Sequence, residues 1–168
     1  VEPITGGVSM LWIISHPELV TAHEVRSGYD TVYAAGGVWA ERMSRQWDLP
    51  IVTLLQATDA TRFHPDVTPA EGNGVLFVGR TRGIARPIVL DAVAAGADLQ
   101  VHGDDGWENF IDPKFVKSSG LPNEQVPAAY AGADIVLNDH WREMADNGFL
   151  SNRLFDAAAT GARIVSDH

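Results

Sequence analysis

The feature that most constrains the fold is a repeated alternation of short apolar, β-branched runs with helical segments. The runs do not alternate polar with apolar residues, which is the pattern of parallel strands that are covered on both faces. Seven runs are expected to form strands: "LWIIS" (11–15), "TVYAA" (31–35), "IVTLL" (51–55), "VLFVG" (75–79), "LQVHG" (99–103), "DIVLN" (134–138) and "RIVSD" (163–167). Helices are expected between them at about 19–27, 38–47, 87–95, 124–132 and 151–160. This order predicts an α/β fold with a doubly wound, Rossmann-like parallel sheet and right-handed crossovers.

One segment breaks this rhythm. Residues 56–74, "QATDATRFHPDVTPAEGNG", hold two prolines and two glycines and few apolar side chains. Such a composition is typical of a linker or of a crossing between domains. It divides the chain into about three βα units before it and about four after it.

Composition narrows the class of protein. The 168 residues include no cysteine, which excludes disulfides and thiolate metal sites and fits a cytoplasmic protein. The formal net charge of −10 argues against binding to DNA or RNA. No apolar run is long enough for an integral membrane segment. The basic residues are mostly arginines, and three of them fall in one short segment: Arg80, Arg82 and Arg86.

That segment, "FVGRTRGIARP", follows a predicted strand and enters a predicted helix. Gly79 allows a ligand to approach the backbone closely, and a helix that begins near Pro87 offers free N–H groups and a positive dipole end. Arginine guanidinium groups match the oxygens of phosphate. The segment therefore fits a diphosphate site. It fits equally a surface loop whose arginines pair with acidic residues of this chain.

Two further loops follow predicted strands. His102 and Gly103 end one strand, and the backbone there is a candidate contact for a base or a sugar; a tight structural turn is the alternative. Asp139, His140 and Asp146 lie in the segment 138–148, but their irregular spacing argues against a metal site. For that segment a solvated acidic loop is the favoured interpretation, and a loop that borders the ligand is the alternative.

The last candidate stretch is "NGFLSNRLFDAAATGARIVSD" (147–167). It begins with a glycine loop before a helix N-terminus, where phosphate can meet bare N–H groups. The candidate contacts are Asn147, Gly148, Phe149, Leu150, Ser151 and Asn152. Asp156 lies about one turn inside the helix, where its carboxylate can accept hydrogen bonds from two vicinal ribose hydroxyls. Stabilisation by the helix dipole, or an ion pair with Arg153 or Arg163, explains the same acid without a ligand.

These motifs together resemble a known family. "FVGR", a strand that ends in His-Gly, "YAGADIVLND" and "FDAAATGARIV" occur in the order found in the donor-binding domain of group 1 (family 4-like) glycosyltransferases of the GT-B fold. The branch related to spore-maturation glycosyltransferases is the most similar. The resemblance covers roughly residues 50–168, and "DATRFHP" in the linker is similar to the family's crossing into its second domain.

The resemblance implies two parts of a larger enzyme. Residues 1–64 would be the last βα units of an N-terminal Rossmann-like domain with the linker, and 65–168 a truncated nucleotide-sugar-binding domain. The donor would be a UDP-, GDP- or similar nucleotide sugar, with no separate cofactor or metal, and the acceptor a glycan, a lipid or a protein. Arg80, Arg82 or Arg86 would hold the diphosphate, the backbone of 148–152 the distal phosphate or sugar, and Asp156 the ribose.

The sequence also departs from the family pattern. Gly148 stands where the family has the first of two acids eight residues apart, and the lysine that accompanies the first arginine has no counterpart. No catalytic residue is identified, and His16, after the first strand, is only a weak candidate. A non-catalytic nucleotide-binding module of Rossmann-like or flavodoxin-like shape is the alternative. A receiver domain is disfavoured because neither Lys114 nor Lys117 ends a strand.

Overall fold

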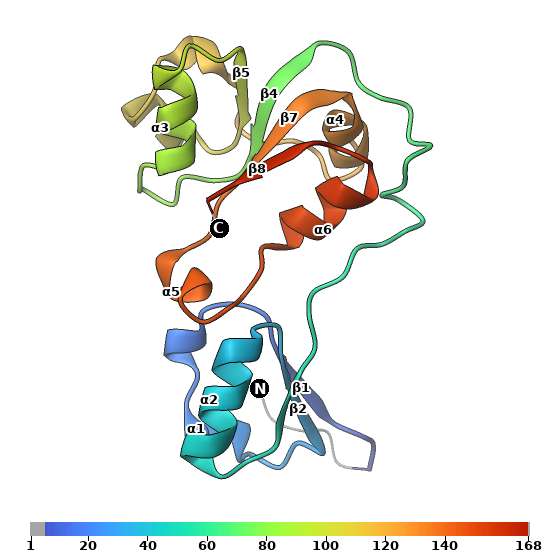
Figure 1. The fold of residues 1–168 in the computed structure, drawn as a ribbon, viewed down its shortest axis with the longest axis vertical. Helices are drawn as coiled ribbons and strands as arrows, with labels where there is room; N and C mark the ends of the chain where they lie inside the picture. Colours follow the sequence, from blue (N-terminus) through green and yellow to red (C-terminus); the bar gives the residue numbers. More distant parts are fainter. Residues whose placement is uncertain (1–5, 168) are drawn as a thin grey trace. The chain divides into compact units, whose positions relative to one another are not determined.

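A computed structural model describes residues 6–167. These residues form two compact units (Figure 1). The first unit contains residues 6–56 together with His140–Ser151, and the second contains Ala57–Asp139 together with residues 152–167. Each unit has its own parallel sheet and its own core.

The first unit is built on three parallel strands in the order β1-β2-β3. The strands are β1 (Met10–Ile13), β2 (Thr31–Ala34) and β3 (Ile51–Thr53), and the helices are η1 (Pro17–Leu19), α1 (Ala22–Val25) and α2 (Gly37–Trp47). One face of the sheet packs on α2 through a buried cluster that includes Ile13, Val32 and Trp39. Side chains of the opposite face, such as Met10 and Trp12, are exposed.

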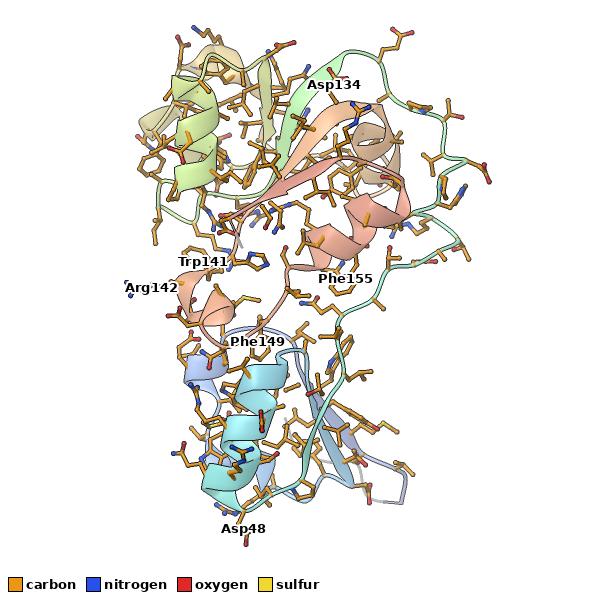
Figure 2. The ribbon with its side chains drawn as sticks, in the orientation of Figure 1. Asp48, Asp134, Trp141, Arg142, Phe149 and Phe155 are labelled. Carbon is orange, nitrogen blue, oxygen red and sulfur yellow. The ribbon has the colours of Figure 1, made fainter. Side chains whose placement is uncertain are left out.

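The segment His140–Ser151 belongs to this first unit although it follows β7 of the second. It holds a short helix, α5 (Arg142–Ala145), and then Phe149, whose side chain is 1% exposed within the first core (Figure 2). The Phe149 ring packs edge-on against Trp39 with ring centroids 6.2 Å apart. A β-bridge between Gly36 and Phe149 completes the attachment.

The second unit contains a five-stranded parallel sheet in the order β6-β5-β4-β7-β8. The strands are β4 (Asn73–Val78), β5 (Leu99–His102), β6 (Val116–Ser118), β7 (Ala133–Asn138) and β8 (Ile164–Ser166). The helices are α3 (Pro87–Ala94), η2 (Asp105–Asn109), η3 (Pro113–Phe115), α4 (Val126–Gly132) and α6 (Asn152–Ala159). The strand order reverses between β4 and β7, the position at which open α/β sheets bind ligands.

Helices cover both faces of this sheet. Leu76 and Val136 point to a core shared with α4 and α6, whereas the next residues, Phe77 and Leu137, point to a core shared with α3. This alternation follows from the two-residue period of a strand and explains why both faces are apolar. Figure 1 shows α3 and α4 on opposite sides of the sheet.

The predicted α/β class with parallel, Rossmann-like sheets is confirmed. All seven predicted strands and the helices at 38–47, 87–95, 124–132 and 151–160 are present with shifts of one or two residues. Several short elements differ from the prediction. The segment 19–27 forms only the short α1 and the last residue of η1. The elements β6, η1, η2, η3 and α5 were not predicted, because segments of three to five residues carry too little pattern.

Candidate functional site

The site is built at the carboxyl edge of the five-stranded sheet. Strands β4, β5 and β7 end at Val78, His102 and Asn138, and because they are parallel these ends lie along one edge. Helix α3 begins after this edge, with Arg86 as its N-cap and Pro87 at its first position. The first turn of α6 reaches the same edge through the side chain of Arg153.

Asp139, the residue after β7, joins two arginines. Its Oδ2 accepts a hydrogen bond from Arg86 Nη1 at 2.7 Å, and its Oδ1 accepts one from Arg153 Nη1 at 3.3 Å. The three side chains are 6–15% exposed. Burial lowers the pKa of Arg86, Asp139 opposes this, and the charges of Arg153 and Arg82 lower the pKa further. An arginine nevertheless stays charged at neutral pH, so the group carries a net charge of about +1.

Arg153 ties α6 to the two central strands. Its Nη2 donates to the Val78 carbonyl at 2.8 Å, and its Nη1 donates to Asn138 Oδ1 at 3.2 Å. Its guanidinium lies 4.7 Å from the centre of the Phe77 ring. Gly79 leaves room for this side chain, because a Cβ at that position would lie 2.9 Å from Arg153 Nη2.

Asp156 lies one turn further along α6 and is half-buried. Its Oδ1 accepts a hydrogen bond from Thr58 Oγ1 at 2.7 Å, and its Oδ2 accepts one from Asn152 Nδ2 at 2.8 Å. Burial raises the pKa of the neighbouring Tyr130; Arg153 opposes this and the charge of Asp156 adds to it. The two hydrogen-bond donors to Asp156 are thus neutral, while Arg153 forms its ion pair with Asp139.

The loop between β4 and α3 is held by Asp104. Asp104 Oδ1 accepts hydrogen bonds from Thr81 N at 3.0 Å and from Thr81 Oγ1 at 2.8 Å. Burial tends to raise the pKa of Asp104, but the hydrogen bonds from Thr81 and Arg82 outweigh it, and the pKa lies below its ordinary value. Arg82 has a positive φ of 52°, and Arg80 and Arg82 are exposed. Of the three candidate arginines, only Arg86 is buried.

His102 and Gly103 lie beside Gly79 at this edge. Gly79 N donates to the His102 carbonyl at 2.9 Å, and Trp107 Nε1 donates to the Gly79 carbonyl at 2.9 Å. A Cβ at Gly103 would lie 2.2 Å from the Gly79 oxygen, so only glycine fits there. Burial and the charge of Lys117 lower the pKa of His102, whose Nδ1 lies 2.8 Å from Ser118 Oγ.

The candidate residues before α6 are divided between the units. Asn152 and Asp156 belong to the second unit, whereas Asn147, Gly148, Phe149, Leu150 and Ser151 belong to the first. Asn147 accepts a hydrogen bond from Arg42 through Oδ1, and its carbonyl accepts one from Trp39 N. Their predicted contacts with a ligand stay predictions.

The structure adds three residues that the sequence did not place in the site. Asp139 is buried between two arginines, so the expectation of a solvated acidic loop is wrong at this position. Arg153 was expected only as a possible partner of Asp156, and it pairs with Asp139. Thr58 lies 98 residues from Asp156 in the sequence, and no local pattern connects the two.

Two general features accompany this site. Within residues 6–167 no helix has both the length and the apolar character that a membrane crossing requires. In the same part of the chain no cluster of three or more histidine, aspartate or glutamate side chains is arranged to hold a metal ion.

Comparison with known proteins identifies the family. Residues 80–168 match a family model described as "Glycosyl transferase-like". The fold is similar to the crystal structure of AviGT4, a glycosyltransferase involved in avilamycin A biosynthesis, with a TM-score of 0.55 and 16% identity. The match covers 96% of this chain and 55% of AviGT4, so the chain spans about half the length of that structure. No curated protein is significantly similar to the sequence. Because the family model covers more than half of its residues, the chain belongs to the glycosyl transferase-like family.

Proposed function

We propose that the second unit binds a nucleotide diphosphate-sugar and that the protein transfers the sugar to an acceptor. Three observations support the proposal. The chain belongs to the glycosyl transferase-like family. Its sheet reverses strand order between β4 and β7, and the N-termini of α3 and α6 meet the carboxyl edge there through Arg86, Asp139 and Arg153. In parallel α/β sheets this is the place where nucleotides bind.

The position of Asp156 is the observation that carries the proposal. An acid inside an apolar helix is more often explained by an ion pair, but Arg153 is engaged by Asp139. An ionised carboxylate has about four acceptor positions. Thr58 and Asn152 use two of them, one on each oxygen. The remaining capacity suits two O–H donors on adjacent carbons, as in the ribose of a nucleotide.

The diphosphate would lie against the arginines of the β4–α3 loop. Arg80 and Arg82 are exposed, and Asp104 holds the loop that carries them. Arg86 is the N-cap of α3, and the positive end of the helix dipole there attracts anions. Arg86, Asp139 and Arg153 add a net charge of about +1. Their side chains are largely buried, and an electrostatic attraction is stronger there than in water.

Sugar transfer would then depend on stabilising the leaving group. When the bond between the sugar and the phosphate breaks, negative charge builds up on the diphosphate. Guanidinium groups and helix N-termini that are already in place stabilise this charge more in the transition state than in the ground state. The backbone at Gly79 and Gly103 would contact the donor, and the acceptor would be a glycan, a lipid or a protein.

Calorimetric titration with UDP and with GDP tests the proposal. We expect one of the two to bind, and we expect Asp156→Ala to weaken it about tenfold or more, since hydrogen bonds to a charged group contribute about 1.5–3 kcal/mol. Asp66→Ala, which removes an exposed acid of the same unit, is the matched control and should bind like the parent protein. Failure of both UDP and GDP to bind, or equal weakening by both variants, would contradict the proposal.

A further inference from the structure

A hydroxyl from the segment after β3 is bonded to the carboxylate of α6. Thr58 Oγ1 lies 2.7 Å from Asp156 Oδ1, and Asn152 Nδ2 lies 2.8 Å from Asp156 Oδ2. A hydroxyl that donates to a carboxylate at this distance forms one of the stronger hydrogen bonds in proteins. The two oxygens of Asp156 are therefore each fixed by a different donor.

We propose that Thr58, together with Asn152, is a positioning residue that sets the discrimination between ribose and deoxyribose. The two donors hold the Asp156 carboxylate in one orientation, and its remaining acceptor capacity then suits the paired hydroxyls of a ribose. This inference rests on the proposed function, because it requires that Asp156 binds a nucleotide ribose. It adds a task for the two residues that bond to Asp156.

The turn that follows Thr58 is closed by local hydrogen bonds. Asp59 Oδ1 accepts hydrogen bonds from Thr61 N at 2.9 Å and from Thr61 Oγ1 at 2.6 Å. The turn ends at Phe63, which is 5% exposed and lies in the same core cluster as Ala157, the residue after Asp156. Packing thus anchors the turn after Thr58 and the helix that carries Asp156 in one core.

The energetic role of these contacts is preorganisation. A carboxylate without fixed partners loses rotational freedom when it binds a ligand, and this loss weakens affinity. A carboxylate without fixed partners also accepts a single hydroxyl in several orientations. The difference in binding free energy between a ligand with two adjacent hydroxyls and a ligand with one then becomes small. Fixing the carboxylate therefore raises the selectivity for ribose more than the affinity for nucleotides in general.

The test compares nucleotides that differ by one hydroxyl. UDP, 2′-deoxy-UDP, GDP and 2′-deoxy-GDP are titrated into the whole chain, and the ratio of the two dissociation constants is measured for the base that binds. For the parent protein we expect a preference of about tenfold for the ribonucleotide. We expect Thr58→Val to reduce it to about threefold or less, and Thr58→Ser, which keeps the hydroxyl, to restore it.

Thr61→Val is the matched control, because it removes a threonine hydroxyl from the same turn that bonds to Asp59 instead of Asp156. It should keep the parent preference. If Thr58→Val does not fold, Asn152→Ala at the exposed start of α6 replaces it. This variant removes the donor to Asp156 Oδ2, and the ratio of dissociation constants is measured in the same way.

The outcomes separate this inference from the proposed function. A parent protein that binds none of the four nucleotides contradicts the proposed function, and this inference falls with it. A parent protein that prefers ribose through Asp156, with the same preference in a folded Thr58→Val or Asn152→Ala variant, overturns the positioning role and leaves the proposed function intact.

Discussion

Asp139 and Arg86, 53 residues apart in the sequence, form a buried ion pair with 2.7 Å between Oδ2 and Nη1. The second oxygen of Asp139 contacts Arg153. One carboxylate thus joins the N-cap of α3 to the first turn of α6 at the end of β7. Removing it leaves two arginines, each at most 15% exposed, without their shared counter-charge.

Asp139→Ala should therefore destabilise the second unit strongly. Breaking a buried pair by removing one partner costs about 3–5 kcal/mol, because an uncompensated charge stays buried. Urea unfolding followed by circular dichroism measures this loss. Asp134→Ala, which removes an exposed acid near the start of β7 (Figure 2), should change the free energy of unfolding by less than about 0.5 kcal/mol. A loss of the same small size for Asp139→Ala would contradict the assigned role of the pair.

Gly103→Ala should disrupt the packing of the strand ends. The new Cβ would lie 2.2 Å from the Gly79 oxygen and 2.4 Å from Trp107 Nε1, and these two atoms are themselves hydrogen bonded. Overpacking costs about 1–3 kcal/mol. Urea unfolding followed by circular dichroism measures the change. Gly120→Ala, where a Cβ meets nothing within 4 Å, should be close to neutral; equal midpoints for the two variants would rule out this close approach.

Phe149→Ala should destabilise the first unit by about 3–5 kcal/mol, the usual cost of removing a buried aromatic side chain. The ring packs on Trp39 and anchors the segment His140–Ser151. Figure 2 labels Phe149. Limited proteolysis of this segment, combined with thermal unfolding, measures the effect. Leu150→Ala, at a position 39% exposed, is the neighbouring control. Unchanged protease resistance in Phe149→Ala would show that the segment is held by other contacts.

His102 should make stability depend on pH. Burial lowers its pKa below the ordinary value of about 6.5, so the unfolded chain takes up the proton first as the pH falls. Its contribution is present above pH 6.5 and is lost as the pH falls from there towards the lower folded-state pKa. Unfolding midpoints at pH 7.5 and 5.5 should differ less in His102→Asn than in the parent protein. Equal differences would contradict the assignment.

The sequence predicted the parallel α/β fold because buried strands and their helices are local patterns. "VLFVG" and "DIVLN" form β4 and β7, and Pro87 begins α3 as expected. Gly79 and Gly103 were also expected at the ends of strands, with a ligand close to their backbone. Their close approach to Arg153 and Trp107 was not predicted, because it depends on residues elsewhere in the chain.

The contacts within the site depend on tertiary pairing. The sequence offers several acids for each arginine, and nothing in the spacing selects Asp139 for both Arg86 and Arg153. The bond from Thr58 to Asp156 is equally non-local. The attachment of Phe149 to the first core was missed because "NGFLS" has the pattern of an ordinary loop before a helix.

The most direct test of the central claim is a crystal structure of the chain with the nucleoside diphosphate that binds it. The account predicts the diphosphate at the N-termini of α3 and α6, beside Arg86, and both ribose hydroxyls on Asp156. A nucleotide bound elsewhere in the second unit, with Asp156 bonded only to Thr58 and Asn152, would contradict it.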